Sequence, residues 1–414
     1  MIDKILKPAK RAYLTVCLLF VLITSGCSLL EIKKQTKILE GAGEIRGIIQ
    51  KNSELEGPIN VMVFEFKGGV LAYQGSVYTT DDGFYKFYVT PGNYALVAYI
   101  DSNQDRNYQD SEPASYNTER PFFDVLPGQI VEPQPITINN EGIDLSEFKM
   151  GKMESVHYAN LGRVMSLDDP IFERENYALG LWKPMEFLEQ VGGGLIFLEE
   201  YDPDKIPVLL IHGINGGPRD WESVLANLDT EAFQPIVYFY ASGIQLDIVS
   251  ETLASQVEEL KQRLGFQRMH VVAHSMGGLV AWSFVKHFYE TYSADEAIID
   301  QVITINSPLE GMASATSGVK HSPIVVQSWR DVAEGSDFLA DLHAWGWPDT
   351  ITYHLVFSHL PGEASDGIVP LESQLPMDLQ KEAVKIYGFI NEHTGTLSDP
   401  EFLELLNRTL KENP

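Results

Sequence analysis

The stretch HVVAHSMGGLVAW, residues 270–282, places Ser275 between an apolar, β-branched run and a pair of glycines. A serine in this position is either a nucleophile on a sharp turn or the N-cap of the helix that follows. A capping serine does not need the MGG that follows it, whereas a strained strand-to-helix turn needs small residues that let the two backbones approach. The pattern therefore favours a nucleophilic serine and acyl transfer through a covalent intermediate.

Two further residues fit the chemistry of an activated serine. The hydroxyl attacks only when a base takes its proton, and a third group must orient that base. Asp366 in ASDGIVP and His393 in NEHTGTLSDPEF follow Ser275 in the order nucleophile, acid, histidine, and no other histidine lies downstream of SDGIVP. Glu310 and Glu363 are alternatives for the acid, because an aspartate before glycine also serves ordinary turns.

These segments resemble the motifs of the α/β-hydrolase superfamily, and in particular those of its lipases and esterases. AHSMGG resembles a lipase form of the nucleophile elbow in which Ala273 replaces the first glycine of G-x-S-x-G, and LLIHGINGG resembles the HG oxyanion loop. The resemblance covers roughly residues 195–410. It implies a triad of the three residues above and oxyanion donors at the backbone amides of Ile214 and Met276. We interpret His212 as structural, because it precedes the nucleophile in the chain.

The elements that must position these residues alternate between strand and helix from Pro207 onward, which is typical of a parallel, doubly wound sheet. We therefore expect an α/β-hydrolase fold over residues 195–414, with the strand RMHVVAHS leading to the nucleophile and a closing helix PEFLELLNRTL. The stretch from Gly311 to Asp349 separates two of the strands, so it is a candidate cap or wall of an acyl pocket whose tryptophans equally fit ordinary packing.

A different pattern fills residues 44–140, where short β-branched or aromatic runs are separated by Gly, Pro, Asn and Asp. This spacing predicts a small all-β sandwich. The motif TPGNYALVAYID resembles immunoglobulin-like or transthyretin-like modules found beside bacterial catalytic domains. Residues 141–194 are expected to form a connector with its own helical patch.

One loop of the sandwich is a candidate metal site. DSNQDRNYQDSE places Asp101, Asn103, Asp105 and Glu112 at the first, third, fifth and twelfth positions of a calcium loop. Arg106 occupies the position where such loops carry glycine, so a solvated acidic loop is the alternative. Calcium here would be structural, and the sequence predicts no metal in the catalytic site.

The first 26 residues are expected to form a signal peptide, because basic residues precede the short apolar run AYLTVCLLFVLIT. TSGC, which ends at Cys27, resembles the lipobox of bacterial lipoproteins, and Ser28 fits sorting to the outer membrane. The resemblance implies that Cys27 carries the lipid, and an ordinary secretory signal is the alternative. Residues 27–43 are then a tether between the anchor and the sandwich.

The overall charge limits the partners. Acidic residues outnumber basic ones 58 to 30, which gives a formal net charge of −28 and argues against a nucleic-acid partner. The triad chemistry requires no cofactor. We expect a serine hydrolase of carboxylic esters, in particular lipid or acyl esters. The alternatives are a thioesterase or deacylase of lipid-linked molecules, and an inactive binding protein anchored in the envelope.

Overall fold

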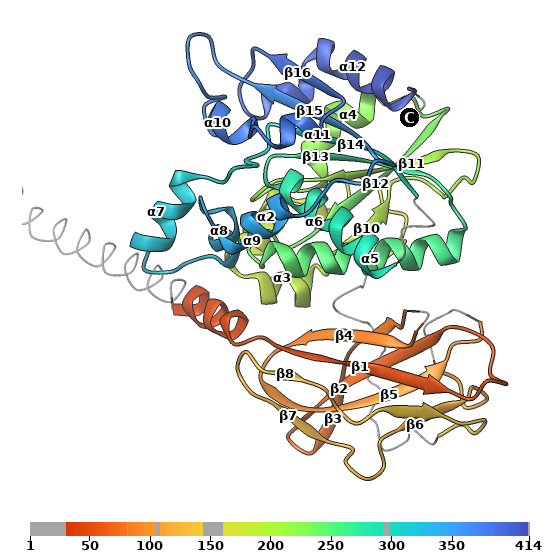
Figure 1. Ribbon diagram of the computed structural model, residues 1–414. Helices are drawn as coiled ribbons and strands as arrows, with labels where there is room; N and C mark the ends of the chain where they lie inside the picture. Colours follow the sequence, from red (N-terminus) through yellow and green to blue (C-terminus); the bar gives the residue numbers. More distant parts are fainter. Residues whose placement is uncertain (1–29, 81, 104–107, 144–159, 293–297, 413–414) are drawn as a thin grey trace, which may run out of the picture.

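The computed structural model describes residues 30–80, 82–103, 108–143, 160–292 and 298–412. Two bodies adjoin in Figure 1, a β-sandwich whose strands span residues 43–138 and a larger α/β domain formed by residues 160–412. Within the described residues, no helix is both long enough and apolar enough to span a bilayer. Cys27 and the expected signal peptide lie outside the described residues.

The sandwich consists of two β-sheets with an apolar core between them. One sheet has the order β4-β1-β8 with β9 also paired to β1, and the other has the order β3-β2-β5-β6 with β7 also paired to β5. Ile45 and Val63 lie in the shared core, as expected for strands that alternate inward and outward side chains. The strands are β1 (Gly43–Lys51), β2 (Ile59–Lys67), β3 (Val70–Tyr78), β4 (Phe84–Val89), β5 (Gly92–Ile100), β6 (Ala114–Tyr116), β7 (Phe123–Val125), β8 (Ile130–Val131) and β9 (Ile136–Ile138).

The α/β domain is built on a sheet with the order β10-β12-β11-β13-β14-β15-β16. Only β10 runs antiparallel to its neighbour, and the other pairings are parallel, as the sequence predicts. The strands are β10 (Gly194–Phe197), β11 (Ile206–Ile211), β12 (Phe233–Phe239), β13 (Met269–His274), β14 (Ile299–Ile305), β15 (Thr352–Ser358) and β16 (Lys385–Phe389).

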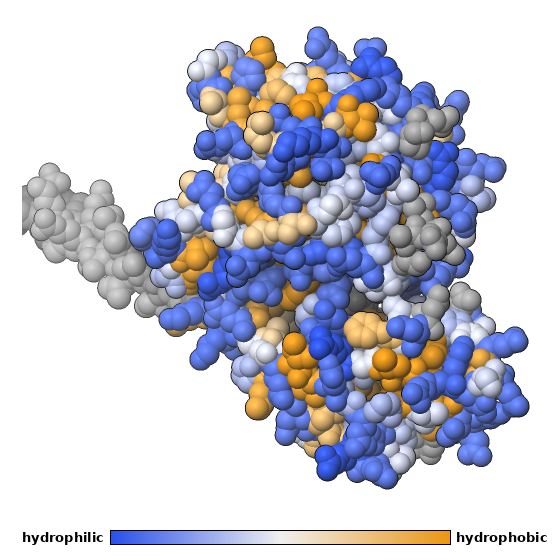
Figure 2. Space-filling view, in the orientation of Figure 1, coloured by the Kyte–Doolittle hydropathy of each residue, from blue (hydrophilic) through white to orange (hydrophobic). Residues whose placement is uncertain are grey.

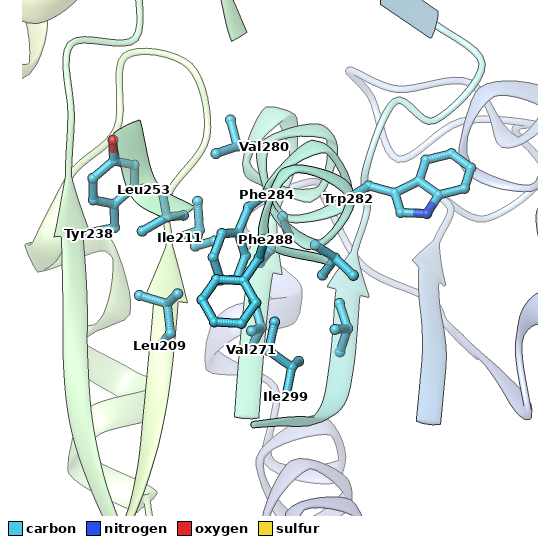
Figure 3. Packing of buried hydrophobic residues seen from close by; sticks show 14 of the residues in the cluster. Leu209, Ile211, Tyr238, Leu253, Val271, Val280, Trp282, Phe284, Phe288 and Ile299 are labelled. Atoms are coloured by element: carbon cyan, nitrogen blue, oxygen red, sulfur yellow. The ribbon is translucent and has the colours of Figure 1, made fainter. Parts of the chain in front are cut away.

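Helices cover both faces of this sheet because its strands are apolar on both sides. Leu209 and Ile211 of β11 face one core, whereas Val208 and Leu210 face the other. Figure 3 shows Phe284 of α6 packed among the first of these sets. The helices are α2 (Arg174–Trp182), α3 (Pro184–Gln190), α4 (Glu222–Asn227), α5 (Leu246–Leu264), α6 (Met276–Thr291), α7 (Ala313–His321), α8 (Gln327–Val332), α9 (Asp337–Ala344), α10 (Leu371–Gln374), α11 (Leu379–Glu382) and α12 (Pro400–Leu410), with 3-10 turns η2 (Pro170–Phe172), η3 (Pro218–Trp221) and η5 (Gly395–Ser398).

The structure changes two of the expected boundaries. Residues 160–194 were expected to belong to a connector, but Tyr177 of α2 and Phe187 of α3 are buried in the core of the α/β domain, so both helices are part of that domain. Residues 27–43 were expected to form a tether, but residues 30–40 are helical and Gln35 is buried. Its Oε1 accepts a hydrogen bond from the Glu186 amide at 3.4 Å, which fixes this segment to α3.

Candidate active site

Ser275 occupies the sharp turn between β13 and α6. Its φ of 56° lies in a region that L-residues other than glycine rarely adopt, so the backbone is strained there. A hydrogen bond of 2.8 Å from its amide to the Ile305 carbonyl holds the turn against β14. A Cβ on Gly277 would lie 2.3 Å from the Ile211 carbonyl oxygen, which explains why glycine stands two residues after the serine.

The structure brings the three predicted residues into one chain of hydrogen bonds. The Ser275 Oγ lies 2.8 Å from the His393 Nε2, and the His393 Nδ1 lies 2.7 Å from the Asp366 Oδ2. All three residues are buried. This is the geometry in which a histidine accepts a serine proton while an aspartate orients the ring.

Asp366 is held as a carboxylate. Burial alone raises its pKa, but the hydrogen bond from His393 and those from the amides of Val369 and Ile368 outweigh it, and the net effect lowers the pKa. The two amides donate to Oδ1 at 2.7 and 2.9 Å, which leaves Oδ2 for the histidine. Asp366 is therefore ionised at neutral pH and favours the His393 tautomer with the proton on Nδ1.

The alternative acids lie away from this arrangement. Glu310 and Glu363 are both exposed. Glu310 lies 3.9 Å from His343, and the His393 Nδ1 is already taken by Asp366. The structure therefore supports Asp366 among the three acids that the sequence offered.

Two residues that the sequence reasoning missed fix the backbone of His393. The His274 Nε2 lies 3.0 Å from the His393 carbonyl oxygen, and the Asn306 side-chain amide donates to the same oxygen at 2.8 Å. Burial lowers the pKa of His274 to about 3, so the ring is neutral and its Nε2 proton is the donor. His274 directly precedes the nucleophile, and this adjacency was the signal that the sequence offered for it.

The two proposed oxyanion donors belong to segments that adjoin Ser275. Met276 is the first residue of α6, and Ile214 follows Gly213, on which a Cβ would lie 2.8 Å from the Ser275 Cβ. Neither the Ile214 nor the Met276 amide donates a hydrogen bond to another backbone or side-chain group in the described part of the chain. Free amides at a helix N-terminus and in the adjacent loop suit a developing negative charge.

His212 holds the loop that carries Ile214. Its Nδ1 lies 2.8 Å from the Gly213 carbonyl oxygen, and its Nε2 accepts from the Tyr240 amide at 3.3 Å. The imidazole ring of His212 stacks on the Tyr240 ring with centroids 4.2 Å apart. Burial lowers the pKa of His212 to about 4, so the ring stays neutral and both hydrogen bonds persist at neutral pH. These contacts give His212 the structural role expected from the sequence.

The segment from Gly311 to Asp349 forms α7, α8 and α9, between β14 and β15. Its tryptophans make packing contacts, and a role in the wall of an acyl pocket stays a prediction. Trp347 packs against Tyr353 with ring centroids 4.9 Å apart, and Trp329 meets Trp182 edge-on at 5.8 Å.

The calcium loop is described only in part, because Asp105 lies outside the described residues. Glu112 is buried, and its two carboxylate oxygens accept hydrogen bonds from the amides of Ser102 at 2.9 Å and Gln109 at 3.0 Å. No cluster of three or more metal-ligating side chains is present in the part of the chain that was described. Calcium binding stays a prediction.

One family model matches part of the chain. Residues 227–382, which include Ser275 and Asp366 but not His393, match the model of a family described as "Alpha/beta hydrolase of unknown function (DUF915)". The C-terminal domain is an α/β hydrolase by fold. No curated protein matches the sequence.

Three solved structures illustrate the similarity. The product of the gene lin2722 from Listeria innocua is 21% identical, with 51% of this chain and 96% of that chain covered and a TM-score of 0.38. Bacillus licheniformis lipase BlEst2 in its mature form is 18% identical, with 50% and 94% covered and a TM-score of 0.39. Aspergillus fumigatus lipase B is 15% identical, with 53% and 56% covered and a TM-score of 0.39.

Proposed function

We propose that this protein is a serine hydrolase that cleaves carboxylic esters with Ser275 as nucleophile, His393 as base and Asp366 as the orienting acid. The observation that carries the proposal is the continuous hydrogen-bond chain from the Ser275 Oγ through His393 to Asp366, with distances of 2.8 and 2.7 Å. The strained backbone of Ser275 is a second support, because strain of this kind is retained at functional sites.

The reaction follows from the positions of the protons. The His393 Nε2 takes the hydroxyl proton as the Ser275 Oγ bonds to the ester carbonyl carbon, and the carbonyl oxygen becomes negative. The Ile214 and Met276 amides stabilise that oxygen, which is worth a factor of about a hundred to a thousand per donor. The C–O bond then breaks, His393 protonates the departing alcohol, and water releases the acid from the acyl-enzyme by the same route.

The acyl group of the substrate is proposed to be apolar. Ile214 is 40% exposed on the loop beside Ser275, and Ile368 is 59% exposed two residues after Asp366. These side chains offer hydrocarbon surface on the segments that carry a proposed oxyanion donor and the acid, which supports a lipid or acyl ester over a small polar one.

The test is a series of p-nitrophenyl esters of increasing chain length, combined with labelling by a serine-reactive fluorophosphonate. We expect hydrolysis by the wild type and complete loss of both hydrolysis and labelling in Ser275→Ala, because no nucleophile remains. Ser283→Ala is the matched control, since Ser283 lies on α6, the helix that follows Ser275, and its Oγ has no hydrogen-bond partner within the described residues. Full hydrolysis by a folded Ser275→Ala protein would remove the proposal.

We also propose that Cys27 is lipidated and anchors the protein in the bacterial envelope, at the outer membrane. The support is the basic segment, the apolar run and TSGC at the N-terminus. A single acyl chain binds a membrane only marginally, so a stable anchor requires several chains on this residue. Cys27→Ser is expected to move the protein from the membrane fraction to the soluble fraction and to lower its mass by the lipid. An unchanged distribution and mass would refute lipidation.

A further inference from the structure

A cavity of about 270 Å³ lies between the two domains, away from the triad. On the sandwich side it is lined by β3 and β4, which belong to different sheets, so the interior between the sheets opens at this edge. On the hydrolase side it is lined by α3, β12 and α5. Figure 2 shows apolar surface, in orange, along the junction of the two domains.

The lining is mostly hydrocarbon and aromatic. Phe87 and Tyr94 contribute from the sandwich, and Phe187, Phe239 and Ile248 contribute from the hydrolase domain. A cavity of this size lies near the lower end of the range of roughly 300–1,000 Å³ for small-molecule sites, which are predominantly apolar with a few polar groups. The volume and the lining therefore suit one hydrocarbon chain.

The charges at the cavity compensate each other. Among the described lining residues, charge is carried by Lys86 and Glu251. Their side chains form an ion pair across the domain junction at 2.9 Å, and the Tyr88 hydroxyl donates to the same carboxylate at 2.6 Å. A carboxylate or ammonium group entering this cavity would find no unpaired countercharge, so an uncharged molecule is favoured.

The edge of β3 supplies polar groups to the cavity. β3 is the outer strand of its sheet and pairs with β2 on one side, and Gln74, Gly75 and Val77 of β3 line the cavity. The backbone N–H and C=O groups on the other side of an outer strand have no strand partner. A ligand hydroxyl or ester oxygen in the cavity would hydrogen-bond to these groups.

We propose that this cavity binds an uncharged single-chain amphiphile, such as a long-chain alcohol or a monoacylglycerol. The hydrocarbon chain lies between the β3 and β4 edges and α5, and the polar group hydrogen-bonds to the backbone edge of β3. The site is separate from Ser275 and does not depend on the proposed esterase activity.

Calorimetric titration of the full chain with 1-decanol, which carries no bond for an esterase to cleave, tests the proposal. We expect saturable binding that is at least about tenfold weaker for decanoate, because its charge has no partner in the cavity. Ser255→Phe fills the cavity from a half-buried position on α5 and should abolish binding. Gln262→Phe places the same ring on an exposed part of the same helix and should leave binding unchanged. Absence of decanol binding, or equal binding by Ser255→Phe, would overturn the proposal.

A second measurement locates the molecule without relying on a folded Ser255→Phe variant. A diazirine-bearing long-chain alcohol is photolysed on the wild type, and the labelled peptides are mapped by mass spectrometry. Label concentrated in β3, β4 and α5 supports the cavity as the site. Label confined to the peptides around Ser275 and His393, or spread evenly over the chain, would show that the alcohol binds elsewhere.

Discussion

Asp366 divides its two carboxylate oxygens between two tasks. Oδ1 accepts from the Val369 and Ile368 amides, and Oδ2 faces the His393 Nδ1. In Asp366→Asn the side-chain oxygen would keep the two amides, so the NH₂ group would turn toward His393. That group can only donate, so the histidine would carry its proton on Nε2 and lose the ability to accept one from Ser275.

We therefore expect Asp366→Asn to keep the fold and to lower kcat by about ten-thousand-fold, the loss known for the same change in a serine protease. The measurement is kcat on a p-nitrophenyl ester, with circular dichroism as the check on folding. Glu363→Gln is the matched control on the same loop and should change kcat little, because Glu363 is exposed. Near-full activity in Asp366→Asn together with collapse in Glu363→Gln would reassign the acid.

The residues that the sequence predicted and those that it missed differ in how they act. Ser275, Asp366 and His393 stand in local motifs and in a fixed chain order, so one sequence was enough to name them. His274 and Asn306 act by holding a carbonyl that lies 119 and 87 residues away, respectively. Contacts between residues so far apart in the sequence depend on the order of the strands in the sheet. A local sequence pattern does not reveal that order.

At the scale of elements, the strands of the α/β domain were predictable because each is a short apolar run between turn residues. The assignment of α2 and α3 to a connector failed for a different reason. Their apolar residues do not indicate which domain the helices pack against, and only the folded sheet shows that Tyr177 and Phe187 complete its core. The helix over residues 30–40 was missed because its apolar periodicity is weak. Tertiary contacts, such as the hydrogen bond between Gln35 and α3, stabilise it instead.

A half-buried carboxylate of α8 joins that helix to the start of α5. The Leu246 amide donates to the Asp331 Oδ2 at 2.7 Å. Burial raises the pKa of Asp331 to about 7, from an ordinary value of 3.8, despite this hydrogen bond. The folded chain therefore holds a proton on Asp331 between about pH 4 and pH 7, where the unfolded chain has lost it. The contribution of Asp331 to the free energy of unfolding therefore falls as the pH rises through this window.

Asp331→Asn removes the ionisation while keeping an oxygen that can accept from Leu246. We expect this variant to gain stability over the wild type at pH 8 and to gain much less at pH 5, as measured by urea unfolding at both values. Asp349→Asn, an exposed residue, controls for the loss of one negative charge from an acidic protein. An equal difference at the two pH values would show that Asp331 does not titrate in this way.

At the scale of the whole molecule, the catalytic residues and their supports belong to one domain. The triad, His274, Asn306 and His212 all lie between residues 206 and 396, and no side chain of the sandwich is among their hydrogen-bond partners within the described residues. The sandwich meets this domain through the Glu251 ion pair and the walls of the cavity. Catalysis and domain association are therefore separable in principle.

Residues 160–414 expressed alone should hydrolyse esters with a kcat close to that of the full chain, but melt at a lower temperature. The lower melting temperature follows because Met185, Leu188 and Ile248, which face the cavity, would lie in water, and because Glu251 would lose Lys86. Glu251→Gln in the full chain separates these effects, since it breaks the ion pair without exposing the apolar surface. It should lower the melting temperature less than removal of the domain does. A soluble, folded fragment without activity, beside an active full chain, would instead show that the sandwich helps to build the catalytic site.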